Sequence, residues 1–539
     1  MVLKDNMNKL LMVAALALAL GSAAYAEETA DLIKSAREAA AADRHREAIR
    51  YYLAAVRADS SLAAELGKEI GYQYTWSDRP DSAVIWFERY LNRYPRDLEG
   101  MLGQARALSW ADRNPEAQHL YQRIQRTHPH SLEARIGEAR VTSWQDRNAE
   151  AEKLYREILN SHPENLEARL GLARVINWQG RHREAREHYR SILNDHPFNR
   201  QAILGLALSE RWLGLDWKAR KHLIRITDNR EAVKALDAIS WENAPRLRLD
   251  YAVSSDSDEL LINRIKGTLS AGVADGTMAR IGAARVWMDQ DNLPSVKRID
   301  LTAGTSKRFN EDWQLNFNLS WLHHSVDTAS PAYTGGDGFD LFTWDGWLTF
   351  TPSRRLRMDL SSSRMAVETP LSVQKEISYT GAGLGADLLL TDRVKAVCGY
   401  EYRTYSDANS RNLIKTALRW KVLSSPFSLE AVPGYTYFAY HEWKPNGYYN
   451  PEGYHNIGLQ LNLGFKISDS VNLLIEGRGS GEKESGEDLF AVGTFRTALE
   501  WKPARYLQAG AEFFTSNSRV AGEAGYRRTL GGLYMIWIF

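Results

Sequence analysis

The sequence predicts a protein of two parts, an all-α repeat solenoid followed by an antiparallel transmembrane β-barrel of about sixteen strands. Tryptophan, alanine and proline recur every 34 residues within 27–240, which indicates the solenoid. Apolar and polar residues alternate with a period of two within 241–539, which indicates strands. A short apolar run near the start, preceded by basic residues, is typical of a secretory signal.

Residues 1–26 are expected to be a signal peptide that is removed from the mature chain. Lys4 and Lys9 form a basic start, 10–20 is apolar, and 24–26 (Ala-Tyr-Ala) is a small-x-small cleavage site. The apolar run is too short to cross a bilayer. The mature chain is therefore expected outside the cytoplasm.

The repeats have a constant interval of 34 residues. It separates Trp76, Trp110, Trp144, Trp178 and Trp212, as well as Ala83, Ala117, Ala151, Ala185 and Ala219, the aromatics Phe87, Tyr121, Tyr155 and Tyr189, and Pro95, Pro129, Pro163 and Pro197. This pattern resembles the tetratricopeptide repeat, in which each repeat is a helix hairpin. The resemblance implies about six repeats, the last an atypical cap, which share one core because a single hairpin cannot bury its apolar face.

On the family pattern, each tryptophan falls late in the first helix, which in the family lines a concave groove. Arg106, Arg140 and Arg174 each stand four residues before a tryptophan, on the same helix face. One interpretation is a ladder that stacks on sugar rings and hydrogen-bonds to hydroxyl or acidic groups. The alternatives are that the indoles pack across the hairpin turns, or that the groove binds a peptide of a partner protein.

The C-terminal half shows alternation that suits strands between lipid and a lumen. In 456–467 every odd-numbered residue is apolar, and the even-numbered residues are Asn, Gly, Gln or Lys; 313–321 and 412–422 follow similar patterns. A small barrel interior has little room for so many large aromatic side chains. The apolar side is therefore expected to face lipid and the polar side a lumen.

The links between the candidate strands alternate in length. Those after even-numbered strands are short, such as 274–277 and 391–393, and those after odd-numbered strands are often longer, such as 325–338 and 442–453. Bacterial outer-membrane barrels have short periplasmic turns, longer outer loops and an even strand count. Both ends of the barrel sequence are therefore expected on the periplasmic side.

The final strand carries a further pattern. Leu533, Met535, Trp537 and Phe539 share one face, and the last residue is aromatic. This resembles the C-terminal signal read by the barrel-insertion machinery of Gram-negative bacteria. The resemblance implies that this machinery and outer-membrane lipid are partners of the chain.

Alternation also assigns charged residues of both signs to the lumen. The candidates are Arg248, Arg264, Lys266, Arg357, Asp359, Arg403, Lys415, Arg419, Glu476, Arg478, Arg496 and Glu500. One interpretation is a network of ion pairs that braces the wall. The other is a hydrophilic conduit that tolerates neutral or acidic solutes. The two are compatible, so these charges do not identify a cargo.

No catalytic, metal or cofactor site is predicted, and no enzyme is expected. The net charge of +1, from 68 Lys and Arg against 67 Asp and Glu, argues against a nucleic-acid partner. The single cysteine, Cys398, excludes a disulfide scaffold and a Cys-based metal site. Metalloprotease, phosphate-loop and nucleophile-elbow motifs are absent from the sequence. The pair His323-His324 is expected at the outer end of a strand, with no third ligand nearby. This indicates a surface position rather than a metal site.

A signal peptide, periplasmic tetratricopeptide repeats and an outer-membrane barrel, in this order, resemble the export porins of synthase-dependent exopolysaccharide systems. The poly-N-acetylglucosamine porin and the outer-membrane subunit of cellulose secretion are similar in plan. The barrel, with Asp-Tyr at 250–251, also resembles the YaiO family. These resemblances imply an exopolysaccharide conduit whose repeats bind periplasmic proteins or the polymer. The alternatives are an anchor or scaffold of an envelope complex without transport and, less favoured, a lipid-modifying outer-membrane enzyme.

Overall fold

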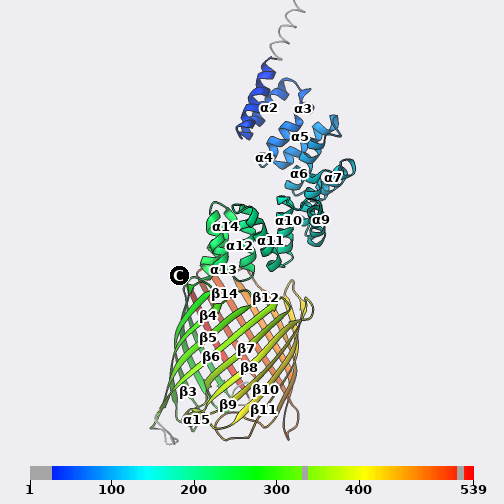
Figure 1. Cartoon of the computed structure of the whole chain (residues 1–539). Helices are drawn as coiled ribbons and strands as arrows, with labels where there is room; N and C mark the ends of the chain where they lie inside the picture. Colours follow the sequence, from blue (N-terminus) through cyan, green and yellow to red (C-terminus); the bar gives the residue numbers. More distant parts are fainter. Residues whose placement is uncertain (1–26, 330–337, 519–526) are drawn as a thin grey trace, which may run out of the picture. The chain divides into compact units, whose positions relative to one another are not determined.

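A computed structural model describes residues 27–329, 338–518 and 527–539. The expected signal peptide and parts of two of the expected longer links lie outside these residues. The chain divides into two compact units, one ending at Leu213 and the other comprising Gly214–Phe539. The first contains helical repeats, and the second contains the last helices and the barrel (Figure 1).

The described part of the N-terminal half is helical and begins with a helix over 27–41. The helices that follow are α2 (His45–Ala58), α3 (Leu62–Glu65), α4 (Gly67–Trp76), α5 (Pro80–Arg93), α6 (Leu98–Trp110), α7 (Asn114–Thr127), α8 (Leu132–Trp144), α9 (Asn148–Ser161), α10 (Leu166–Trp178), α11 (His182–Asp195), α12 (Arg200–Trp212), α13 (Asp216–Leu223), the 3-10 turn η1 (Ile224–Ile226) and α14 (Arg230–Glu242). The first helix of a repeat ends at the periodic tryptophan in α4, α6, α8, α10 and α12. The predicted helical repeat solenoid is confirmed.

Local signals for these helices recur with the repeat. An Asp, Ser or Asn side chain caps each of α6, α8, α10 and α12 by accepting a hydrogen bond from the N–H three residues later. A residue with positive φ then turns the chain into the second helix at Asp112 (59°), Asp146 (60°) and Gly180 (73°). Each hairpin is therefore encoded by a cap before its first helix and a left-handed residue after it.

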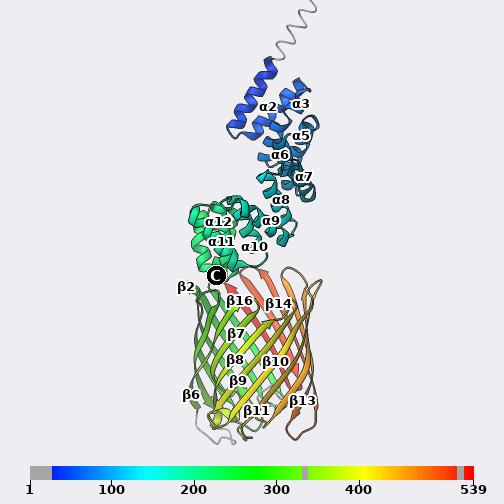
Figure 2. The same ribbon diagram turned by 45° about the vertical axis from the view of Figure 1, so that its right-hand side comes forward.

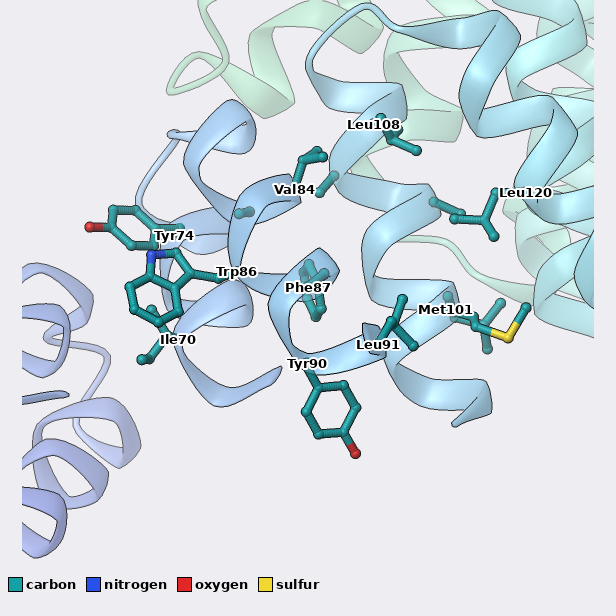
Figure 3. Packing of buried hydrophobic residues seen from close by; sticks show 14 of the residues in the cluster. Ile70, Tyr74, Val84, Trp86, Phe87, Tyr90, Leu91, Met101, Leu108 and Leu120 are labelled. Atoms are coloured by element: carbon teal, nitrogen blue, oxygen red, sulfur yellow. The ribbon is translucent and has the colours of Figure 1, made fainter. Parts of the chain in front are cut away.

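Neighbouring hairpins pack through an aromatic ring against a glycine. A Cβ atom placed on Gly103 would lie 2.5 Å from the ring of Phe87, and one on Gly137 would lie 2.4 Å from the ring of Tyr121. Figure 3 shows Phe87 in the middle of the first core cluster, with Met101 of the following helix nearby. The missing side chain lets the next helix approach the ring closely, which sets the spacing of the repeats.

Sixteen antiparallel strands form a closed barrel, in which β16 pairs with β1. They are β1 (Arg246–Asp256), β2 (Leu261–Ala274), β3 (Thr277–Asp289), β4 (Val296–Arg308), β5 (Trp313–Val326), β6 (Gly338–Ser353), β7 (Leu356–Ala366), β8 (Ser378–Leu389), β9 (Val394–Tyr405), β10 (Ser410–Leu423), β11 (Ser428–Tyr440), β12 (Tyr454–Lys466), β13 (Val471–Glu484), β14 (Phe490–Ala504), β15 (Leu507–Ser516) and β16 (Arg528–Ile538). A short helix, α15 (Pro370–Gln374), lies between β7 and β8. The predicted strand count is confirmed.

Side chains of the strands alternate between the outside and the lumen. In β12, Ile457, Leu459 and Leu461 are 67%, 47% and 43% exposed, whereas Asn456 is 7% exposed. The same alternation leaves Ile414, Leu418 and many other apolar side chains on the outside of the barrel. An apolar surface of this extent marks contact with lipid or with another protein.

The two ends of the barrel differ in the length of their links (Figure 2). We call the end where β1 begins and β16 ends the terminal rim, and the opposite end the distal rim. The strands are joined at the terminal rim by short links such as 275–276 and 354–355. The distal rim carries longer links, among them 367–377 and 441–453. The predicted difference in link length is observed.

Helices α13 and α14 pack on the terminal rim (Figure 1). Lys221 Nζ lies 2.8 Å from Asp275 in the β2–β3 turn. Arg505, between β14 and β15, lies 2.6 Å from Asp237 of α14 and 4.5 Å from the ring of Trp241. Because β1 and β16 lie between these two turns in the ring of strands, the helices are held on both sides of the seam that closes the barrel.

Candidate functional site

The periodic tryptophans are partly exposed at the ends of the first helices. Their exposed fractions are 51% for Trp76, 48% for Trp110, 37% for Trp144, 49% for Trp178 and 71% for Trp212. Small and aliphatic residues, rather than the indoles, form the buried sides of these helices. We call the exposed side of α4, α6, α8, α10 and α12 that carries the tryptophans the ladder face.

Some of the indoles contact another ring or a cation. These contacts join Tyr72 to Trp76 (5.4 Å between ring centroids), Arg140 to Trp144 (5.7 Å from cation to centroid) and His182 to Trp212 (5.6 Å between centroids). Within the described ranges, neither Trp110 nor Trp178 has such a contact. The indoles of the ladder face thus differ from repeat to repeat in whether a ring or a cation of the chain already contacts them.

Cations of the ladder face pair with carboxylates at the start of the next first helix. The pairs are Lys68–Glu99 (2.8 Å), Arg106–Glu133 and Arg140–Glu167 (2.9 Å). Although burial opposes the charge of Lys68, the hydrogen bond to Glu99 and the charge of Asp97 raise its pKa above the usual value. Arg174 stands at the corresponding place in α10 but forms no ion pair with any described residue.

Most of the predicted lumen residues form ion pairs along the barrel wall. The pairs are Arg248–Asp250 (2.7 Å), Arg357–Asp359 (3.1 Å), Arg403–Glu401, Arg419–Glu430 (3.7 Å), Glu476–Arg496 (3.4 Å), Arg496–Glu512 (3.1 Å) and Glu500–Lys502 (3.1 Å). Each joins residues of one strand or of two neighbouring strands. These pairs therefore run along the wall rather than across the lumen.

The remaining candidates have other environments. Arg478 donates a hydrogen bond to Asn456 Oδ1 at 2.5 Å, while Lys266 and Lys415 form no ion pair within the part of the chain that the structure describes. Three of the predicted residues, Arg248, Arg496 and Glu500, line one hollow of about 720 Å³, together with Asp250, Glu512 and Tyr534. This hollow offers hydrogen-bond donors and acceptors, including side chains of both charges, to a polar solute.

Arg264 takes part in a cluster at the distal rim. Its guanidinium lies 2.7 Å from Glu368, and Arg298 of β4 lies 2.9 Å from the same carboxylate. Glu368 belongs to the link 367–377 between β7 and β8. The cluster therefore ties this link to the inner side of β2 and β4.

Apolar contacts hold link 367–377 against two opposite parts of the wall. Val373 belongs to a cluster with inward side chains of β2–β5, among them Met288. Val367 and Ile377 belong to a second cluster with inward side chains of β9–β12, among them Phe438. Seven strands separate β3 from β11 in either direction around the ring. The link therefore crosses the distal end of the lumen, and we call it the crossing segment.

A second link reinforces the crossing segment. The Ser372 hydroxyl donates a hydrogen bond of 2.7 Å to the Asn446 carbonyl, and Lys375 Nζ donates one of 2.9 Å to the Pro445 carbonyl. Both acceptors lie in link 441–453. Two links thus interlock at the distal rim.

The role of Glu368 is not among the sequence-based predictions, and His324 lies inside the barrel rather than at the expected surface position. His323 points outward and lies 2.8 Å from Asp340, but His324 is 0% exposed and stacks on Phe339 at 4.4 Å. The expected surface position of His324 is wrong because successive residues of a strand point to opposite sides. The pair Thr369-Pro370, a helix-start signal, was the available sign that the crossing segment is structured.

The residues of the predicted insertion signal share the outward side of the last strand. Leu533, Met535, Trp537 and Phe539 are 59%, 42%, 40% and 65% exposed. Residues 27–329, 338–518 and 527–539 contain no group of three or more His, Cys, Asp or Glu side chains suited to hold a metal ion. All helices within these ranges are too short or too polar to cross a membrane.

Comparisons with known proteins find one family profile and several solved structures that are similar to this chain. A family profile described as tetratricopeptide repeat matches residues 145–207. A solved structure described as a bacterial polysaccharide outer membrane secretin is similar at 15% identity, with 55% of this chain and 99% of that chain covered and a TM-score of 0.45.

Two further structures are similar to the repeats. A tetratricopeptide repeat protein from Parabacteroides merdae has 16% identity over 40% of this chain and 86% of its own, with a TM-score of 0.36. A thermophilic TPR protein from Thermus thermophilus has 17% identity over 34% of this chain and 98% of its own, with a TM-score of 0.29. Curated protein sequences give no match. The chain thus combines a helical repeat region, which matches the tetratricopeptide-repeat profile over residues 145–207, with a closed barrel of sixteen strands, as predicted.

Proposed function

We propose that this protein is an outer-membrane conduit for an exopolysaccharide, with periplasmic repeats that bind partner proteins or the polymer. The observation that carries the proposal is a closed barrel with apolar side chains outside and charged side chains inside. Such a barrel satisfies its backbone polar groups within lipid and lines a path for a polar solute.

The ladder face supports a polymeric cargo. Its exposed indoles recur at one interval along the repeats and offer flat apolar faces to the C–H surfaces of sugar rings. Neighbouring guanidinium groups donate hydrogen bonds to hydroxyl or acidic groups. Many weak and similar contacts allow a chain to advance from one position to the next without being trapped.

The crossing segment sets a condition on export. Glu368 and α15 lie across the distal end of the lumen, so a polymer passes only when the segment moves aside. The same observation favours a second function, in which the barrel is an anchor that holds the repeats in an envelope complex without transport.

Conductance of the full chain in a planar lipid bilayer separates the two functions. Glu368→Gln removes the charge that two arginines share, and we expect it to raise the open fraction above that of the wild type. Asp359→Asn is the matched control, because it alters a carboxylate that pairs along the wall with Arg357. If neither the wild type nor Glu368→Gln nor a chain with 367–377 replaced by a Gly-Ser link conducts, the conduit is refuted and the anchor remains.

Binding of oligosaccharides tests the ladder face. We expect simultaneous replacement of Trp110, Trp144 and Trp178 by alanine to abolish binding, because the stacking surfaces are lost. Calorimetric titration of the full chain in detergent micelles measures the affinity. An unchanged affinity, with an intact helical circular dichroism signal, would contradict a role of these indoles.

A further inference from the structure

The series of ion pairs on the ladder face ends at α10. Arg106 reaches Glu133 and Arg140 reaches Glu167, each 27 residues further along the chain. The residue 27 positions after Arg174 is Gln201, at the same place in α12. A neutral amide therefore stands where the earlier repeats have a carboxylate, and Arg174 has no hydrogen bond or ion pair to any residue in the described ranges.

The indole beside this guanidinium is also unoccupied. Trp178 stands four residues after Arg174 on the same helix face, is 49% exposed, and contacts no other aromatic ring or cation of the described chain. In the preceding repeat, by contrast, Arg140 lies over Trp144 and is neutralised by Glu167. Among the described repeats with an arginine four residues before the tryptophan, the one at α10 is the only one that combines a guanidinium without a described partner and an indole without a described ring or cation contact.

We propose that Arg174, Trp178 and Gln201 form a binding site for a carboxylate-bearing sugar unit of the polymer. The sugar ring stacks on the Trp178 indole, and its carboxylate accepts hydrogen bonds from the Arg174 guanidinium and the Gln201 amide. The inference rests on the proposed function and deepens it, since it assigns an acidic polysaccharide as cargo. The sites around Arg106 and Arg140 recognise the same polymer without selecting for charge, because their cations are already paired.

The ladder favours a polysaccharide over an acidic peptide. Its indoles recur at one interval, which matches a polymer of identical units better than a peptide of varied side chains. A carboxylate beside an aromatic platform also fits a sugar acid, in which an apolar ring face and the charge belong to one residue. A polyglutamate peptide is therefore a competitor to include in the test.

The test titrates the full chain, in detergent micelles, with an oligogalacturonate and with its methyl ester, which has the same backbone without the charge. We expect the wild type to bind the acid about tenfold more tightly than the ester, the size of a charge-assisted hydrogen bond. Arg174→Gln and Gln201→Glu should both remove this preference by weakening binding of the acid. Gln201→Glu recreates the ion pair of the preceding repeats, so this variant is expected to fold.

The control variant combines Arg113→Gln with Glu116→Gln at the start of α7, which removes a paired cation outside the ladder face without changing the net charge. It should keep the preference for the acid. Equal affinity of the wild type for acid and ester overturns the inference but leaves the proposed function intact. Failure of both sugars to bind overturns the inference and the role of the ladder face in binding the polymer, and so does binding of polyglutamate alone, dependent on Arg174; the conduit itself is tested by conductance. Loss of the preference in the control variant also overturns the assignment to Arg174.

Discussion

Replacing Gly171 by alanine tests the contact that sets the spacing of the ladder. The added Cβ would lie 2.3 Å from Tyr155 Cζ and 2.4 Å from Cε1, closer than the 3.0 Å below which real Cβ contacts essentially never occur. Tyr155 is 3% exposed, so its ring is enclosed on all sides. Overpacking lowers the free energy of unfolding by about 1–3 kcal/mol, and the better helix propensity of alanine offsets about 1 kcal/mol of this loss. We expect a net loss of about 1 kcal/mol, which lowers the unfolding midpoint of the helices by about 3 °C.

The assay is thermal unfolding of the full chain, followed by the helical circular dichroism signal. In a Tyr155→Leu background the ring is absent, so Gly171→Ala should become stabilising by about 1 kcal/mol. Lys153→Ala is the control, because its side chain is 77% exposed and the change should stay within about 0.5 kcal/mol. A stabilising effect of Gly171→Ala in the wild type, or no change of sign in the double variant, would refute the reasoning.

Three further predictions concern the rim, the repeats and insertion. Arg505→Ala removes the contact to Asp237, so limited proteolysis should cut α14 faster; an unchanged rate argues against docking. Burial opposes the charge of Glu69, but the hydrogen bond from Arg37 lowers the pKa of its carboxyl group below the usual value. The ionised Glu69 therefore stabilises the fold above its unfolded pKa of about 4.3, and this stability is lost as the pH falls. In urea titrations at several pH values Glu69→Gln should reduce this acid-dependent loss, and an identical loss would disprove the linkage. Phe539→Ser should lower the fraction of heat-modifiable barrel in membranes, and an equal fraction would exclude a role in insertion.

Periodic patterns in the sequence are sufficient to predict the two-part fold. The 34-residue interval places each tryptophan at the end of a first helix, and the two-residue alternation places side chains such as Ile457 and Asn456 on opposite sides of a strand. The same patterns identified most of the ladder face and lumen candidates. They succeed because a helix or strand repeats its orientation over a few residues, so local order alone decides which side a residue faces.

Such patterns do not predict contacts between residues that are distant in the sequence. Glu368 meets Arg298 and Arg264, which precede it by 70 and 104 residues. The neutral residue opposite Arg174 is likewise recognised only from the structure, because the ion pairs Arg106–Glu133 and Arg140–Glu167 show which residue of the next first helix faces each arginine. The sequence by itself determined the repeats, the strands and the sides of each. Only the tertiary structure decided that the crossing segment spans the lumen, because that depends on the closure of the strand ring, which brings β3 and β11 to opposite walls.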